Sequence, residues 1–346
     1  MDNKRFCILT IRYVLLALLV IALIILLVDP FLHYHAPIPP LQAVETDERS
    51  AMTGVAKHEH YDTALIGSSM SENFLASWFE DGVFGDSCVK ICLQGAHFSD
   101  YDVILKEVCS HPEVRNVVFC LDNYLLLNNP DEYPVTIPAY LSDPSLTTEA
   151  YYLWNKSVVT EYLPKYLVNN LVETEDDAYV WSHDYEFSKE IVKSICEAQP
   201  VIPKQDELPF DTYFPFADSF LDGIKPYLEA RPDITFCFYA SPYNICYWED
   251  VVRRGNLTAE ICTLERVYKE LLSYENVRLF YFQDDYDLIT DLDHYRDYCH
   301  FDQSVNRMMY ESMRDGKKEV SQQTYYDTLL RQYDFASAYD YSTMFD

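Results

Sequence analysis

The sequence predicts an α/β protein in which a mostly parallel, five-stranded sheet lies between two layers of helices and is preceded by one transmembrane helix. Two patterns support this prediction. Short, continuous apolar runs alternate with stretches of helical periodicity, as they do in parallel sheets that are buried on both faces. The chain also opens with a long apolar run that is suited to crossing a lipid bilayer.

The opening apolar run covers residues 6–28 and has no charged residue from Tyr13 onward. A helix of this length, rising about 1.5 Å per residue, crosses a hydrocarbon core of about 30 Å. A secretory signal peptide is the competing interpretation, but its apolar region is usually shorter and is followed by an A-x-A cleavage site. Because Lys4 and Arg5 precede the run, we expect residues 1–5 in the cytoplasm and the remaining domain on the outer side of the cell membrane.

The alternation of strands and helices begins after a proline-rich spacer at residues 29–55. The five predicted strands are residues 63–66, 89–93, 116–121, 234–239 and 277–282. Ligands of parallel sheets bind beyond the carboxyl ends of the strands. We therefore expect the functional residues in the loops that follow these strands.

Residues 125–209 interrupt this alternation. The stretch is rich in Tyr, Asn, Asp and Pro and is too long for a simple connection. We interpret it as a partly helical insertion over the functional site. The domain that carries the sheet is expected to span residues 56–315, and a helix with a tyrosine-rich tail is expected at residues 316–346.

The composition argues against several classes of partner and cofactor. The formal net charge of −30 repels nucleic acid phosphates, so a nucleic acid partner is not expected. The ten cysteines form no CxxC pair, and three of them, Cys92, Cys120 and Cys237, fall in predicted strands, so we expect free thiols rather than a disulfide framework. Two His-x-His pairs lack a third ligand, so neither a metal nor another cofactor is expected.

The segment after the first predicted strand contains a candidate nucleophile. Gly67 ends the strand, and Ser68 and Ser69 follow it at the expected start of a helix. This placement exposes a serine hydroxyl beside backbone N–H groups, which can stabilise an oxyanion. Helix capping is the alternative interpretation, because serine is a common N-cap residue.

A candidate base follows the last predicted strand. Asp297 precedes His300 by three positions, and such a carboxylate can accept the Nδ1–H of the ring while Nε2 faces a nucleophile. The spacing also arises by chance, and Asp291 and His294 repeat it nearby. The order of the motifs is more informative than either motif alone, because the serine follows the first strand and the Asp-x-x-His follows the last.

This order of motifs resembles the SGNH, or GDSL-like, hydrolase superfamily over roughly residues 60–315. Here Ser68 replaces the aspartate of the family's Gly-Asp-Ser motif, and Ser69 stands at the position of the nucleophile. The family's Asp-x-x-His motif matches Asp297 and His300. The resemblance therefore implies a flavodoxin-like three-layer sandwich, the SGNH fold, in which Ser69 is the catalytic nucleophile, His300 its base and Asp297 the acid that orients the base.

Two further motifs of the family concern an oxyanion hole. The family has a glycine after the second strand, which matches Gly95, and an asparagine after the third strand, which matches Asn123. The rest of the third motif is absent here. The resemblance implies that the N–H groups of Ser69 and Gly95 and the amide of Asn123 form the oxyanion hole.

The resemblance also implies a function in a bacterial cell envelope. It points to a membrane-anchored serine O-acyl esterase or acyltransferase that acts through an acyl-serine intermediate. The implied partners are an acylated glycan or envelope polymer, a membrane-bound O-acyltransferase and the membrane itself. The alternative is a non-catalytic envelope protein that uses this fold to bind a glycan or a membrane acyltransferase. Hydrogen-bond contact between Ser69 and His300 would favour the enzyme, and a wide separation would favour the binding protein.

Overall fold

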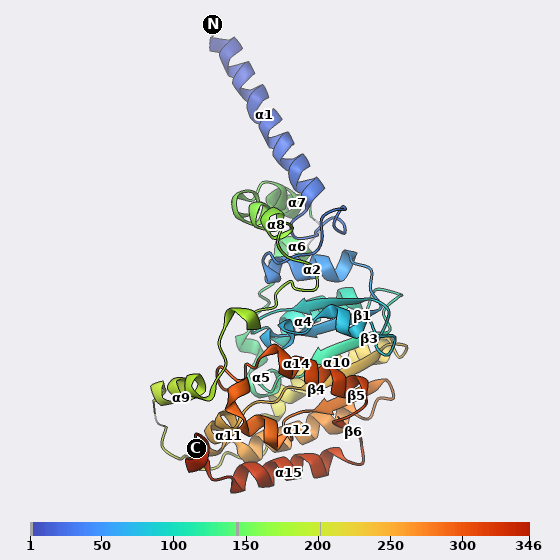
Figure 1. Ribbon diagram of the computed structural model, residues 1–346. Helices are drawn as coiled ribbons and strands as arrows, with labels where there is room; N and C mark the ends of the chain where they lie inside the picture. Colours follow the sequence, from blue (N-terminus) through green and yellow to red (C-terminus); the bar gives the residue numbers. More distant parts are fainter. Residues whose placement is uncertain (1–2, 143–144, 201) are drawn as a thin grey trace. The chain divides into compact units, whose positions relative to one another are not determined.

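The computed structural model describes residues 3–142, 145–200 and 202–346 (Figure 1). The chain divides into two compact units. The anchor unit comprises Met1–His60 and Val135–Tyr179, and the sheet unit comprises Tyr61–Pro134 and Val180–Asp346. The stretch expected as a single insertion, residues 125–209, is therefore shared between the two units.

The sheet unit is built on a six-stranded sheet of order β2-β1-β3-β4-β5-β6. Its strands are β1 (Thr63–Gly67), β2 (Cys88–Cys92), β3 (Asn116–Cys120), β4 (Thr235–Ala240), β5 (Val277–Tyr281) and β6 (Glu319–Val320). The first five strands are parallel, and β6 pairs with β5 in the antiparallel direction. The predicted α/β fold with a mostly parallel sheet is thus confirmed.

The sixth strand is not predicted by the sequence, because its two residues are too short to form an apolar pattern. It lies in the tail that was expected to begin with a helix. The edge pairing is reinforced by an ion pair between Arg278 on β5 and Glu319 on β6, whose Nη2 and Oε2 atoms are 2.8 Å apart. The C-terminal helix α15 (Tyr325–Ala338) follows this strand.

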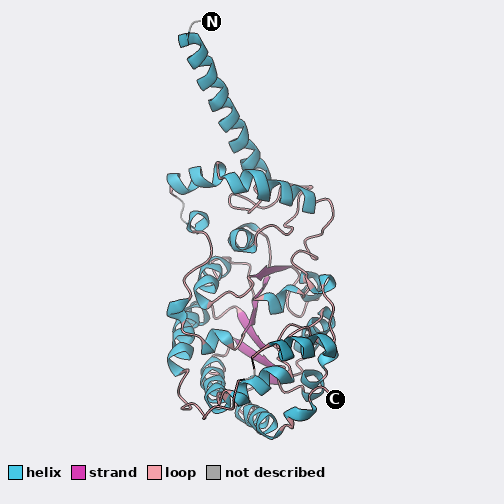
Figure 2. Ribbon diagram, turned by 90° about the vertical axis from the view of Figure 1, so that its left-hand side faces the viewer, coloured by secondary structure: helices cyan, strands magenta, loops and turns pink. Residues whose placement is uncertain are grey.

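Helices cover both faces of the sheet (Figure 2). Every residue of β1 and β2 is buried, which explains why these strands appear in the sequence as mostly apolar runs, with Lys90 in β2 as a charged exception. All ten cysteines are free thiols, and Cys92, Cys120 and Cys237 are buried in β2, β3 and β4. The larger helices of the sheet unit, besides α15, are α4 (Phe98–Val108), α9 (Lys189–Ala198), α10 (Phe214–Ala230), α11 (Ile245–Arg253), α12 (Leu257–Leu271) and α14 (Gln303–Arg314).

The strand order reverses direction between β1 and β3. Because β1 lies between β2 and β3, the chain moves outward from β1 to β2 and then crosses back to β3. The connections after β1 and β3 therefore leave in opposite directions, and such a switch point is where open α/β sheets bind ligands. Ser69 follows β1 and Asp122 follows β3, so both residues lie at this point of the sheet.

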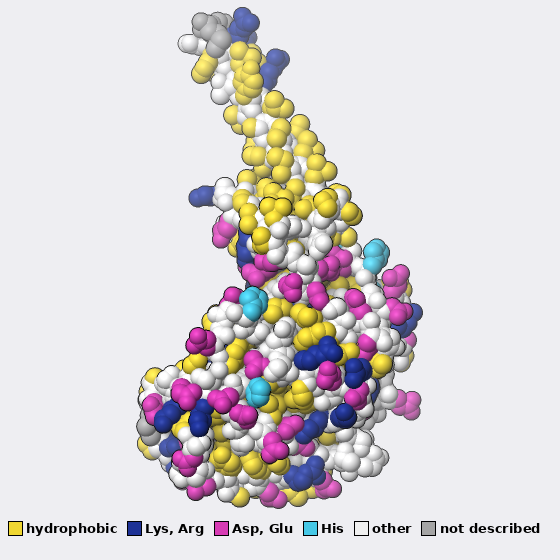
Figure 3. Space-filling model, in the orientation of Figure 1, with side chains coloured by type: hydrophobic (Ala, Val, Ile, Leu, Met, Phe, Trp, Pro, Cys, Tyr) yellow, Lys and Arg dark blue, Asp and Glu magenta, His cyan; other side chains and the backbone are white. Residues whose placement is uncertain are grey.

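The N-terminal helix α1 (Asn3–Val28) belongs to the anchor unit. Among the described residues, it is the one helix that is long and apolar enough to cross a membrane. Hydrophobic side chains cover its visible surface, and basic residues lie near its start (Figure 3). These properties fit either a membrane anchor or a signal sequence.

The anchor unit has a core of its own. Its other helices are α2 (Glu48–His58), α6 (Ala139–Ser142), α7 (Leu146–Leu153) and α8 (Leu163–Asn169). Helix α2 lies mostly in the stretch expected as a spacer, and the Asp47 side chain caps it by accepting a hydrogen bond of 3.0 Å from the Ser50 N–H. The buried core side chains come from both chain segments of the unit: Ile25, Phe31, Ala51, Leu141, Tyr152 and Val158.

Candidate active site

The turn after β1 presents Ser69 at the start of the short helix α3 (Ser69–Glu72). Gly67 is required there by close packing, because a Cβ at this position would lie 1.8 Å from Ser71 Oγ and 2.8 Å from the Cβ of Cys120. Ser68 is the N-cap, and its Oγ accepts a hydrogen bond of 3.3 Å from the Met70 N–H. The capping role therefore belongs to Ser68, and the Ser69 side chain takes no part in it.

The Ser69 hydroxyl contacts His300, although 231 positions separate the two residues. Ser69 Oγ lies 2.9 Å from His300 Nε2, and His300 Nδ1 lies 2.8 Å from Asp297 Oδ2. The other carboxylate oxygen of Asp297 accepts bonds from the backbone N–H groups of Cys299 (3.0 Å) and His300 (2.8 Å). The structure thus brings the three predicted catalytic side chains into one hydrogen-bonded chain.

Asp297 is held in its ionised form. Burial would raise its pKa, but hydrogen bonds from the His300 side chain and from two backbone N–H groups lower the pKa to about 2. An ionised carboxylate at this position keeps a proton on Nδ1 of His300, so that Nε2 is free to accept a proton from Ser69. The histidine of the second Asp-x-x-His motif, His294, does not contact Ser69. Its Nδ1 atom lies 2.9 Å from Oδ2 of Asp302.

The two predicted oxyanion donors beyond Ser69 differ in their placement. Gly95 lies in the turn after β2 with a φ of +57°, a conformation that favours glycine. The amide of Asn123 is engaged in the core: its Nδ2 donates to Glu260 Oε1 at 2.6 Å and to the Tyr247 hydroxyl at 3.2 Å. The Asn123 amide is thus tied to buried partners, and its role as an oxyanion donor stays a prediction.

Asp122 is a buried carboxylate that the motif analysis missed. Its Oδ2 accepts a hydrogen bond of 2.6 Å from the Ser68 hydroxyl, and its Oδ1 accepts one of 2.9 Å from the Tyr243 hydroxyl. Burial raises the pKa of Asp122, although these two bonds and a contact with Cys120 oppose the rise. The bond to Ser68 ties the loop after β3 to the turn that presents Ser69.

A second residue that the motif analysis missed is Trp181. Its indole Nε1 donates a hydrogen bond of 3.0 Å to the Ser69 carbonyl, and its ring meets the His300 imidazole edge-on, with centroids 5.5 Å apart. Asn73 holds this segment in place by accepting bonds from the backbone N–H groups of Trp181 (3.0 Å) and Ser182 (2.9 Å). The tyrosine-rich composition of residues 125–209 indicated an aromatic insertion, but not which side chain reaches the serine.

No known protein-family model matches this sequence, and no curated protein matches it significantly.

One group of side chains offers the ligand types of a metal site. The ligand atoms of Asp297, Cys299 and His300 all lie within 4.8 Å of one another. The Asp297 and His300 atoms are already hydrogen-bonded to each other, however, and burial raises the pKa of the Cys299 thiol well above its usual range. A protonated thiol is a poor metal ligand, so this group fits a hydrogen-bonded relay better than a metal site.

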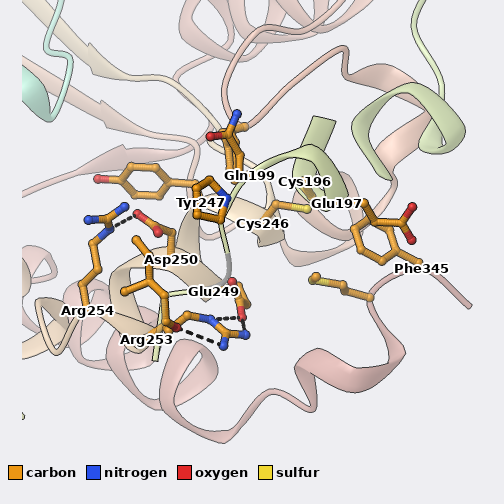
Figure 4. A pocket seen from close by; sticks show the side chains of 14 residues that line it. Cys196, Glu197, Gln199, Cys246, Tyr247, Glu249, Asp250, Arg253, Arg254 and Phe345 are labelled. Carbon is orange, nitrogen blue, oxygen red and sulfur yellow. Dashed lines mark hydrogen bonds and ion pairs between the residues drawn. The ribbon is translucent and has the colours of Figure 1, made fainter. Parts of the chain in front are cut away.

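A cavity of about 650 Å³ lies beside the loop that carries His300 (Figure 4). Its lining includes Tyr298 but neither Ser69 nor His300. The two arginines in the lining are neutralised, because Arg253 pairs with Glu249 and Arg254 Nε lies 2.6 Å from Asp250 Oδ2. The cavity is therefore distinct from the space in front of the serine.

Proposed function

We propose that this chain is an SGNH-type serine O-acyl esterase or acyltransferase that acts on an acylated glycan or polymer of the bacterial cell envelope. The observation that supports the proposal most strongly is the 2.9 Å contact between Ser69 Oγ and His300 Nε2, with Asp297 behind the imidazole. A serine hydroxyl is a weak nucleophile until a base removes its proton. The same contact favours the enzyme over a non-catalytic binding protein.

The proposed reaction has two acyl-transfer steps. His300 Nε2 accepts the proton of Ser69 while Oγ attacks the ester carbonyl, and Asp297 stabilises the imidazolium that forms. The tetrahedral oxyanion is bound by the backbone N–H groups of Ser69 and Gly95, and each such donor lowers the barrier by about 2.7–4 kcal/mol. The alcohol then leaves with the proton from His300. Water or a second hydroxyl group repeats these steps in reverse to release the acyl group from Ser69.

The anchor unit supports retention of α1 as a membrane anchor rather than its removal as a signal sequence. Ile25, in the last turn of α1, is buried in the core of this unit. The buried Asp29 carboxylate, directly after the helix, accepts hydrogen bonds from the Tyr152 hydroxyl (2.7 Å) and from the Tyr34 N–H (2.6 Å). Trp154 Nε1 also donates to the Leu18 carbonyl within the helix at 2.9 Å. Cleavage after α1 would remove part of this packing.

Labelling of the full-length, detergent-solubilised protein with a fluorophosphonate tests the proposal. This probe reacts with activated serines, so the wild type should be labelled, whereas Ser69→Ala and His300→Ala should not. His294→Ala is the matched control, because it removes the histidine of the other Asp-x-x-His motif and should leave labelling intact. A well-folded wild type that is not labelled, or labelling that persists in Ser69→Ala, would refute the proposal.

A further inference from the structure

Arg296 differs from the other arginines of this acidic protein. Among the described residues after α1, each of the other arginines forms an ion pair with a carboxylate. Arg296 has aromatic neighbours instead of a carboxylate within the described chain. In a chain with a net charge of −30, in which acidic groups outnumber basic ones, an arginine without a carboxylate needs a physical explanation.

The guanidinium of Arg296 lies over the rings of Tyr185 and Trp181. Its central carbon lies 3.6 Å from the ring centre of Tyr185 and 5.9 Å from that of Trp181. Stacking uses the face of the planar group and leaves the N–H donors at its edge, which is the geometry that binds carboxylate or phosphate through two hydrogen bonds. Arg296 is half-buried and Tyr185 is 49% exposed, so the stacked pair lies at the protein surface.

Arg296 is connected to the proposed nucleophile, Ser69, through His300 and Trp181. The backbone N–H of Arg296 donates a bond of 3.0 Å to the His300 carbonyl. Trp181 connects the remaining groups, since its indole N–H binds the Ser69 carbonyl and its ring contacts the imidazole of His300. Trp181 therefore contacts Ser69, His300 and the Arg296 guanidinium.

We infer that Arg296, stacked on Tyr185 beside Trp181, binds an anionic group on the glycan whose ester Ser69 attacks. The substrate class is an O-acylated sugar that carries a carboxylate or a phosphate close to the ester. This inference rests on the proposed function. The net charge of −30 repels densely charged polymers, so a single unpaired arginine favours glycans in which anionic groups are isolated. The arginines of the cavity in Figure 4 cannot take this role, because their carboxylate partners already occupy them.

Calorimetric titration of full-length Ser69→Ala protein in phosphatidylcholine nanodiscs tests the inference, since this background keeps the site but removes the attack. The probes are a trisaccharide with a single terminal glucuronate for a carboxylate, glucose 6-phosphate for a phosphate, and maltotriose as the neutral comparison. At least one acidic probe should bind more tightly than maltotriose. Adding Arg296→Gln should weaken its binding about ten-fold or more, and Arg296→Lys should weaken it less, because lysine keeps the charge but not the planar pair of donors.

Arg307→Gln is the matched control. Arg307 also lies over two aromatic rings, those of Trp78 and Tyr310, but it pairs with Glu311. This substitution should leave the affinity for the acidic probe unchanged. The inference is overturned if acidic and neutral probes bind equally, or if Arg296→Gln and Arg307→Gln have the same effect while both variants keep the melting temperature of the parent protein.

The labelling experiment separates this inference from the proposed function. Fluorophosphonate labelling of wild-type Ser69 without any preference for acidic probes would overturn the role of Arg296 and leave the hydrolase standing. Arginine-dependent binding of an acidic probe without labelling would support the anion site and would count against the enzyme.

Discussion

The Ser68 hydroxyl donates a hydrogen bond of 2.6 Å to Oδ2 of Asp122, and this bond joins the loops that follow β1 and β3. Both side chains are buried. The Tyr243 hydroxyl completes the arrangement by donating to Oδ1 at 2.9 Å. Because Ser68 directly precedes Ser69, this buried bond helps to fix the turn that presents the proposed nucleophile.

Asp122→Ala should lower the free energy of unfolding by about 2–4 kcal/mol, because it leaves two buried hydroxyl groups without their acceptor. Ser68→Ala should cost less, about 1–2 kcal/mol. Urea denaturation of the two single variants and the double variant measures their coupling, which we expect to exceed about 0.5 kcal/mol. The exposed Asp184→Ala is the control and should have little effect. Strictly additive losses would show that the Ser68–Asp122 bond does not contribute to stability.

Glu260 should make stability depend on pH. Burial raises the pKa of this carboxyl group to about 7, although hydrogen bonds from Tyr247 and Asn123 oppose the rise. A glutamate in the unfolded chain titrates near 4.5. Between these two pH values the folded state binds more protons at this group than the unfolded state. The contribution of Glu260 to the free energy of unfolding is therefore fully present below about pH 4.5 and is lost as the pH rises through about 7.

Glu260→Gln should remove this dependence, because the amide stays neutral while its Oε1 still accepts hydrogen bonds. Between pH 4.5 and 7 the wild type should lose on the order of 3 kcal/mol from this group, and the variant should not. Urea denaturation at several pH values across this interval measures the difference. The exposed Glu275→Gln should behave as the wild type does. Equal pH slopes for Glu260→Gln and wild type would contradict the prediction.

Trp181→Phe should slow the reaction of Ser69 without removing any catalytic side chain. The variant keeps an aromatic ring beside His300 but loses the 3.0 Å hydrogen bond from Nε1 to the Ser69 carbonyl. We expect the rate of fluorophosphonate labelling to fall about five- to ten-fold, which corresponds to one neutral hydrogen bond of about 1 kcal/mol. Trp154→Phe removes an equivalent bond to the Leu18 carbonyl in the anchor unit and should leave the rate unchanged. Indistinguishable rates for Trp181→Phe and wild type would show that this bond does not position Ser69.

The sequence by itself predicted the elements whose signals are local. A strand that is buried on both faces is mostly apolar, so β1 to β5 are visible in the sequence as short apolar runs, interrupted only by Lys90 in β2 and Arg278 in β5. The candidate residues Ser69, Asp297 and His300 follow the ends of such strands, and the topology of a parallel sheet collects the loops at those ends on one edge. An apolar run long enough to span a bilayer likewise predicted α1.

The tertiary structure alone decided which polar groups become partners. Asn123 was expected at the oxyanion, but its amide binds Glu260, which lies 137 positions away in the sequence. Trp181 reaches Ser69 from a stretch whose composition indicated only an aromatic insertion, and Arg296 stacks on Tyr185 without a carboxylate among the described residues. A buried donor is satisfied by whichever acceptor the packed chain brings within about 3 Å, and no local pattern in the sequence records that distance.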